Sequence, residues 1–327
     1  MNELNLPSVG MAGWYKMEAL VLDDLGQEVS RRLLADWFPN LITDQGLDYL
    51  GTLGPSGQWG DYLKCCQVGT GNTAPANADT ALATYLAGTL TVNALTTSVQ
   101  GSAPYYAFTR KTFRFAAGTA TGNIAEVGVG RTTATGQLFS RALVLDGGGN
   151  PTTITVLSNE VLDVTYEFRV YPPLTDTNGN ITIASVNYAY TLRAANVTSV
   201  HTLFGGNGWG VGSGGTGQDS GAVVNIASPA DQLARTGVLA AITTIPSGAI
   251  SAAGSTTAIA YSTGTSQMDG VVTFGLNNGN DAGGIKSIVF QFHCGCYQIQ
   301  FTPNIPKDAT KQLTLTFRHS WTRAVIP

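Results

Sequence analysis

Hydrophobic and polar positions alternate with the two-residue period of a β-strand over several long stretches of the chain. The clearest stretch is 161–170, where one parity carries only apolar or aromatic side chains: Leu162, Val164, Tyr166, Phe168 and Val170. Successive side chains of a strand point to opposite faces, so this strand is expected to bury one face and solvate the other. Two apolar runs precede it, at 124–129 and 138–145. Thr/Gly and Gly-Gly-Gly-Asn-Pro segments separate the three runs, which predicts an antiparallel meander.

Further runs of this kind predict strands on both sides of the meander. They cover residues 14–22, 28–37, 62–68, 89–100 and 105–116 before it, and 181–194, 270–276, 284–293, 297–301 and 313–321 after it. A short helix is an alternative for 28–37. The pair Asn178-Gly179 is typical of a hairpin turn and predicts one just before the run at 181.

Few helices are expected, and all of them are short. The best one has Thr43 or Asp44 as its cap, leucines at three-residue spacing, and Gly54-Pro55 at its end. One or two helical turns are predicted at 79–87. A serine-proline pair followed by an acid predicts a helix start at 228–231.

The predicted strands divide the chain into two parts, which follow a short N-terminal segment. Residues 1–13 lack periodicity and are interpreted as an N-terminal arm. Residues 14–173 form a first β-sandwich module, which Pro172-Pro173 ends because proline donates no ladder hydrogen bond. Residues 174–327 form a second one, and both modules close on an alternating strand that ends in Phe-Arg. The predicted fold is therefore mainly β, with two tandem antiparallel β-sandwich modules and few short helices.

The composition indicates a protein that covers part of its surface with other copies of itself. Only 12% of the residues are charged, against 43% hydrophobic ones, so charge cannot cover a large surface. A homo-oligomer is predicted, with a trimer preferred. The net charge of -4 and the absence of a basic run argue against nucleic acid as a partner. No apolar stretch approaches the roughly 20 residues of a membrane span, and no signal segment is present, so synthesis in the cytoplasm is expected.

The sequence shows no pattern that supports catalysis or a bound metal. The cysteines occur as Cys65-Cys66 and Cys294-Gly-Cys296, neither of which has the spacing of a zinc or redox site. No metalloprotease or nucleophile-elbow motif occurs, and no pair of acids is set apart as a glycosidase pair would be. We therefore expect no catalytic residues, no cofactor and no metal site.

Four segments resemble tail fibre or tail-tip structural proteins of tailed bacteriophages and prophages. They are DYLKCCQVGTGNTAPANADTAL, RFAAGTATGNIAEVGVG, LFSRALVLDGGGNPTTITVLSNEVLDVTYEFRVYPP and TPNIPKDATKQLTLTFRHSW. The resemblance implies a non-enzymatic, symmetric oligomer in the virion tail, near the baseplate or fibres, with other tail proteins as partners. A head, collar or decoration protein is an alternative. So is a tail-associated carbohydrate-binding or depolymerase module.

The first candidate contact segment is the N-terminal arm. It carries Leu4, Leu6 and Val9 without a core of its own. Segments of this kind become ordered when they bind a partner. The arm is therefore predicted to dock the protein onto the virion.

Two loops of the second module are candidates for contact with a host receptor, a surface polysaccharide or a neighbouring subunit. The loop 205–221 presents Gly208, Trp209 and Gly210, and the loop 277–284 begins with Asn277 and Asn278. Binding residues gather on loops that a rigid scaffold holds, and tryptophan is a frequent anchor. As an alternative, the glycines of the first loop only allow close packing against a neighbouring subunit.

Overall fold

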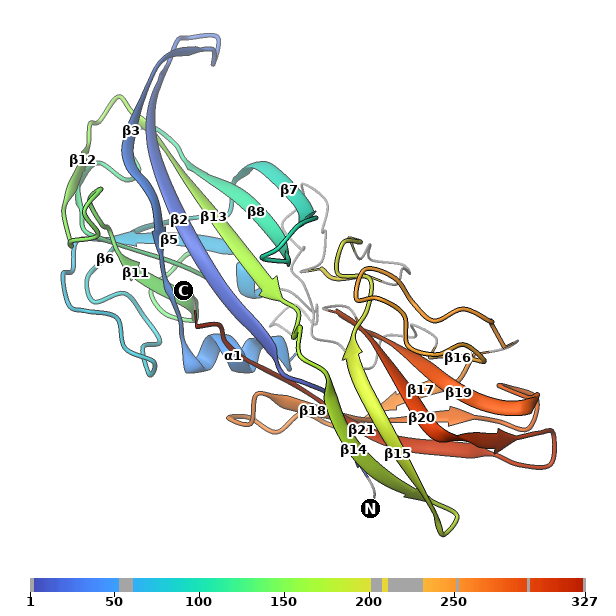
Figure 1. Ribbon diagram of the computed structural model, residues 1–327. Coiled ribbons are helices and arrows are strands. Elements are labelled where there is room, and N and C mark those ends of the chain that lie inside the picture. The colour runs from blue at the N-terminus through green and yellow to red at the C-terminus, as the bar shows by residue number, and fades with distance from the viewer. Residues whose placement is uncertain are drawn as a thin grey trace.

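The computed structural model describes residues 3–52, 61–200, 208–210, 232–250, 253–292 and 295–325. Within these ranges the chain is mainly β, as predicted, with a single α-helix. The strands form two layered bodies that lie end to end and give the molecule an elongated shape (Figure 1). No helix in the described ranges is long and apolar enough to cross a membrane.

The first body is a β-sandwich of two five-stranded layers. One layer contains β3 (Glu28–Pro39), β2 (Val9–Leu22), β13 (Val161–Tyr171), β8 (Tyr106–Phe115) and β7 (Val92–Gln100), in that order. The other contains β4 (Leu41–Ile42), β11 (Leu138–Leu143), β10 (Glu126–Gly130), β5 (Cys65–Gly69) and β6 (Tyr85–Thr89). The small pair β9 (Gly122–Ile124) and β12 (Ile154–Val156) lies beside them.

Aromatic side chains from both layers fill this first core. Phe139 of β11 meets Phe168 of β13 edge to face, with ring centroids 5.2 Å apart. The Tyr15 hydroxyl of β2 is hydrogen-bonded to Ser140 of β11 at 2.9 Å, which satisfies two buried polar groups. The apolar parity predicted for 161–170 is confirmed, since Phe168 and its apolar companions are buried in this core. The solvated opposite face is wrong: Asp163 and Glu167 are buried too, because arginine side chains of β8 bind their carboxylates.

The second body is a sandwich built from the later strands. One layer contains β17 (Ser255–Ala258), β18 (Gln267–Phe274) and β21 (Leu313–Arg323), with β1 (Glu3–Asn5) on the far side of β21. The other contains β14 (Thr177–Ile183), β15 (Val186–Ala194), β20 (Gly295–Lys307), β19 (Asp281–Phe292) and β16 (Leu233–Arg235). Phe317 of β21 packs between Phe290 and Phe292 of β19, at centroid distances of 5.3 and 5.4 Å.

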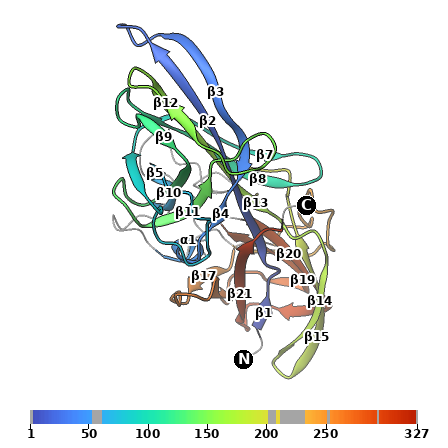
Figure 2. The same cartoon turned by 90° about the vertical axis from the view of Figure 1, so that its left-hand side faces the viewer.

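The first residues of the chain join the two sandwiches. β1 pairs in parallel with Thr316–Arg318 of β21, and Val9–Met11 of β2 pair in parallel with Trp321–Arg323. A single sheet of nine strands therefore runs through both bodies, as Figure 2 shows where β1, β2 and β21 meet. The predicted module boundary at residue 173 falls between β13 and β14. The nine-stranded sheet contains strands from both sides of this boundary, so the two modules share one sheet.

The interpretation of residues 1–13 as an irregular arm without a core is wrong. Leu4, Leu6 and Val9 are buried in the chain's own hydrophobic core. The sequence did not show this, because the segment pairs with β21 in two short stretches, residues 3–5 and 9–11, too short for a periodic pattern. Docking onto a virion through these residues stays a prediction, although this chain already covers their side chains.

The predicted helix is confirmed at its start and is shorter than expected. α1 spans Asp44–Leu50, and the Thr43 hydroxyl caps it by accepting a hydrogen bond from the amide of Gly46 at 2.9 Å. The only other helical segment in the described ranges is the 3-10 turn η1 (Asp61–Leu63). The helical turns predicted at 79–87 are wrong, since β6 begins at Tyr85. The helix start predicted at 228–231 lies outside the described residues.

The hairpin turn predicted at Asn178-Gly179 is also wrong. Both residues lie inside β14, and the chain reverses six residues later, at Ala184-Ser185. These two residues have φ angles of 47° and 67°, the left-handed pair that a two-residue hairpin turn requires. The Asn-Gly signal failed because the Tyr190 ring occupies the space above Gly179, where a Cβ would lie 2.5 Å from the Tyr190 hydroxyl. The glycine is needed there for packing and not for a turn.

A buried carboxylate fastens the long connection between β5 and β6. Glu126 of β10 accepts four hydrogen bonds of 2.7–3.0 Å, from the backbone amides of Gly71, Ala83 and Thr84 and from Nε of Arg141. Arg141 is buried as well and also donates to Asp79, at 2.5 Å. Because one anionic group satisfies three backbone donors, the connection is tied to the sheet at both of its ends.

Candidate functional site

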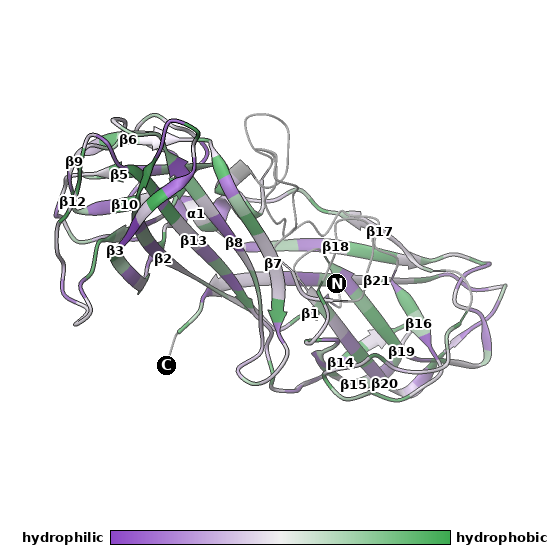
Figure 3. Cartoon of the chain, turned by 90° about the horizontal axis from the view of Figure 1, so that it is seen from above, coloured by the Kyte–Doolittle hydropathy of each residue, from purple (hydrophilic) through white to green (hydrophobic). Residues whose placement is uncertain are grey.

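The open side of the first sandwich carries a cluster that we call the aromatic–arginine face. It consists of Trp14, Trp37, Tyr106, Phe108, Arg110, Glu167 and Arg169. The register places Trp14, Glu167 and Arg110 in one row across β2, β13 and β8. Arg169 and Phe108 are paired in the next row. Because alternate residues of these strands fill the core, this row faces away from the second layer. Figure 3 shows the alternation as bands along β2, β13 and β8.

Each arginine of the face lies over aromatic rings. The Arg169 guanidinium is 3.9 Å from the centroid of Trp14 and 4.4 Å from that of Tyr106. The Arg110 guanidinium is 5.1 Å from Trp37 and 5.4 Å from Phe108. Cation–π contacts of this kind contribute roughly 0.5–2 kcal/mol each, more as water is excluded.

A single carboxylate beneath the rings fixes both guanidinium groups. Glu167 is buried and accepts hydrogen bonds from Arg110, with Nε at 2.7 Å, and from Nε of Arg169 at 2.5 Å. Charge-assisted bonds are strong and directional, so the two arginines are held in place before any partner arrives. Trp37 and Arg110 remain accessible, with 39% of Trp37 and 43% of the Arg110 side chain exposed.

Ion pairs continue the face toward the β2–β3 hairpin. Arg114 donates two hydrogen bonds of 2.7 Å to Asp163, and this contact raises the pKa of the guanidinium. On the neighbouring strands Glu18 pairs with Lys16 at 3.1 Å and with Arg31 at 3.2 Å. The charges of the face are thus mostly compensated within it, which leaves flat aromatic and guanidinium surfaces as its accessible groups.

This arrangement is suited to binding another protein surface. Tryptophan, tyrosine and arginine are enriched at the centres of protein interfaces, and side chains already fixed by their neighbours lose little entropy on binding. The face holds no nucleophile with an adjacent base. Among the described residues, no group of three or more His, Cys, Asp or Glu side chains is placed to hold a metal ion.

Sequence reasoning missed this face. The residues alternate with the core positions of β2, β8 and β13, so their outward direction was available from the pattern. Their association was not, because four strands contribute and only the pairing register brings Trp14 beside Glu167 and Arg110. Trp37 is added by β3, which bulges twice between Tyr15 and Glu18 of its partner.

Trp209 lies in the core, so the prediction of an exposed anchor there is wrong. The side chain is fully buried, and its indole Nε1 donates a hydrogen bond to the carbonyl of Ala195 at 2.8 Å. Its ring meets Tyr297 edge to face at 5.4 Å. Gly208 and Gly210, on either side, are buried too. The rest of the predicted loop lies outside the described residues.

The second predicted contact loop joins β18 to β19. Asn277 is exposed there, as expected for a contact residue. Asn278 is half-buried, and its amide donates to the carbonyl of Ala253, which fixes the loop against the segment before β17. Contact with a host or subunit at this loop stays a prediction.

The described cysteines are apolar core residues. Cys65, Cys66 and Cys296 are buried and form no disulfide. Burial raises the pKa of the Cys66 thiol well above its usual value, and that of Cys296 in the same way. A thiol that stays protonated is a poor nucleophile and a poor metal ligand. Cys294 and His293 lie outside the described residues.

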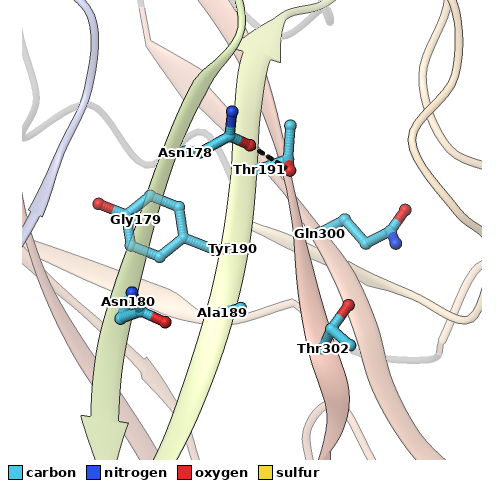
Figure 4. A pocket seen from close by; sticks show the side chains of 8 residues that line it. All are labelled: Asn178, Gly179, Asn180, Ala189, Tyr190, Thr191, Gln300 and Thr302. Carbon is cyan, nitrogen blue, oxygen red and sulfur yellow. Dashed lines mark hydrogen bonds between the residues drawn. The ribbon is translucent and has the colours of Figure 1, made fainter.

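A shallow polar groove of about 350 Å³ crosses the outer side of β14, β15 and β20 (Figure 4). Its lining consists of Asn178, Gly179, Asn180, Ala189, Tyr190, Thr191, Gln300 and Thr302. The register sets Asn178, Thr191 and Gln300 in one row, and the Thr191 hydroxyl donates to Asn178 at 2.6 Å. The groove offers neutral amides and hydroxyls and no carboxylate or amine.

None of the family models, curated proteins or solved structures that were compared matches the chain.

Proposed function

We propose that the protein is a non-enzymatic structural protein of a bacteriophage tail, of the tail fibre, tail tip or baseplate, that acts as a homo-oligomer. The aromatic–arginine face carries the assembly part of the proposal. It joins two tryptophans, two further aromatic rings and two arginines on the open side of a sheet. Groups of this kind supply most of the binding energy at protein interfaces, where a single residue is often worth 2 kcal/mol or more.

The tail location is supported by the resemblance of the four segments to tail fibre and tail-tip proteins. The low share of charged residues agrees with a surface that is largely covered by neighbouring subunits. Attachment to a host is the finer part of the proposal, for which Asn277 and its loop remain candidates.

Association of the purified chain tests the assembly part. Trp37→Ala and Arg110→Ala remove the two most accessible groups of the face and leave Arg169 paired with Glu167. We expect each to weaken self-association at least tenfold in analytical ultracentrifugation, about 1.4 kcal/mol. Val238→Ser, on a loop of the second sandwich, is the matched control. A wild-type chain that stays monomeric at all concentrations contradicts the proposal. Antibody labelling of particles by electron microscopy tests the tail location.

A carbohydrate-binding module is the second candidate, favoured by the polar groove of Figure 4. Amide and hydroxyl groups both donate and accept hydrogen bonds, as neutral sugars do. A panel of immobilised bacterial polysaccharides provides the probe. Binding that Asn180→Ala and Thr302→Ala abolish, and that Asn150→Ala in the first sandwich leaves intact, supports this function. Binding that all three variants retain removes the groove from consideration.

A further inference from the structure

The turn between β2 and β3 presents a single large apolar side chain at one end of the molecule. Leu25 is 81% exposed. The turn around it is ordered, because one carboxylate oxygen of Asp23 accepts hydrogen bonds from the amides of Leu25 and Gln27, at 2.9 and 2.8 Å. Gly26, with a φ of 76°, completes it. A prearranged turn of this kind loses little conformational freedom on binding.

The other end of the molecule carries an apolar groove of about 410 Å³, which we call the mouth groove. It opens between the β14–β15 turn and the start of β21. Its larger apolar lining residues are Ile183, Val186, Tyr188, Ile305 and Leu313, with Ala184 and Pro306 beside them. Tyr188, Ile305 and Leu313 are buried and form its floor, whereas Val186 is 46% exposed at its rim. An exposed leucine on a narrow turn suits an apolar groove, because transferring such a side chain out of water is favourable.

The charges around the two features are of opposite sign. Asp23, Asp24 and Glu28 surround Leu25, and Glu28 is paired with Arg31. Lys307 and Lys311 line the mouth groove. Lys307 is buried, with its amine bonded to Asn280 at 2.6 Å, so Lys311 is the accessible cation. Lys311 is paired with Asp308 at 2.7 Å, and an incoming carboxylate from Asp24 gives it a second anionic neighbour.

We propose that the β2–β3 turn of one copy inserts Leu25 into the mouth groove of a second copy, with Asp24 placed toward Lys311. The inference rests on the proposed function as a homo-oligomer. The two features lie at opposite ends of the molecule (Figure 1), so one chain cannot fill its own groove. The contact joins two different surfaces and is therefore head to tail. Copies linked in this way close into a ring or continue as a filament.

Two variants test the contact, each blocking one end of the full-length chain. Leu25→Ser removes the inserted side chain and leaves the mouth groove intact. Val186→Glu places a charge at the rim of the groove and leaves the β2–β3 turn intact. We expect each variant alone to lose the head-to-tail contact, with at least a tenfold weaker association. In a mixture, the β2–β3 turn of the Val186→Glu chain can still bind the groove of the Leu25→Ser chain. The other two surfaces of this pair are blocked, so the mixture should form one-to-one complexes that grow no further. Val238→Ser is the control for loss of an exposed apolar side chain.

A charge exchange provides a second, independent test. Asp24→Lys and Lys311→Glu are each expected to weaken association, and the double variant Asp24→Lys/Lys311→Glu should recover part of it. Association that Leu25→Ser and Val186→Glu leave unchanged overturns the head-to-tail contact. If Trp37→Ala and Arg110→Ala still weaken that association, the proposed function stands without it. A wild-type chain that never associates overturns both.

Discussion

Replacing Glu126 by alanine should destabilise the first sandwich more than the loss of any exposed carboxylate. The change leaves Arg141 buried with Asp79 as its remaining anionic partner, and it removes the acceptor of three backbone amides. Removing one partner of a buried ion pair costs about 3–5 kcal/mol. Each buried donor left without an acceptor adds about 1–3 kcal/mol, reduced where the connection moves to reach water. We therefore expect a loss of at least about 3–5 kcal/mol in the free energy of unfolding.

Two measurements check this value. Urea unfolding monitored by tryptophan fluorescence gives the change in stability, and hydrogen exchange gives the local effect at the amides of Gly71, Ala83 and Thr84. Glu28→Ala is the matched control, because Glu28 also pairs with an arginine but lies at the surface, where ion pairs contribute little. A loss below about 1 kcal/mol for Glu126→Ala, with unchanged amide protection, would show that this carboxylate does not hold the connection.

Three further predictions concern the second sandwich. Trp209→Ala should lower the free energy of unfolding by about 3–5 kcal/mol, as expected for a large buried side chain, and Trp209→Phe should lower it less. Equal stability of the wild type and Trp209→Ala in chemical unfolding contradicts the burial of Trp209 in the core. Deleting residues 1–8 should lower the thermal midpoint and expose dye-binding apolar surface, because Leu4 and Leu6 are each worth about 2–5 kcal/mol; an unchanged midpoint speaks against the β1–β21 pairing. Burial lowers the pKa of His319 to about 3, so between about pH 6.5 and 3 the unfolded chain binds a proton that the folded chain does not. Stability should therefore fall as the pH drops through this window, by up to about 1.4 kcal/mol per pH unit, and His319→Gln should flatten the slope in denaturant midpoints measured from pH 7 to pH 4.

Much of the strand pattern was predictable from local sequence. The alternation of 161–170 and 105–116 gives β13 and β8, and the Thr43 cap gives the start of α1. These features depend on neighbours within a few positions of one another, and period two is the direct consequence of the pleat.

Features that depend on distant partners were not predictable in this way. The glycines around Trp209 suggested a surface loop, yet the ring fits against Gly295, where a Cβ would lie 2.8 Å from it. Ala184-Ser185 carries no glycine or asparagine to mark a turn. The aromatic–arginine face needs the register of four strands, and no pattern along one strand contains that information.

The parallel pairing of β1 with β21 also sets an order in time. Residues 3–11 are synthesised more than three hundred residues before their partners at 316–323. At translation rates of about 5–20 residues per second, roughly 15–60 s pass between the synthesis of these residues and that of their partners. During this interval Leu4 and Leu6 lack the strand that covers them in the folded chain. All strands of the first sandwich have been synthesised by residue 171, so this sandwich can fold during the delay. A chain interrupted before residue 313 lacks the strand that receives β1, so the waiting segment stays open to chaperones and proteases. The nine-stranded sheet can therefore close only after β21 has been synthesised.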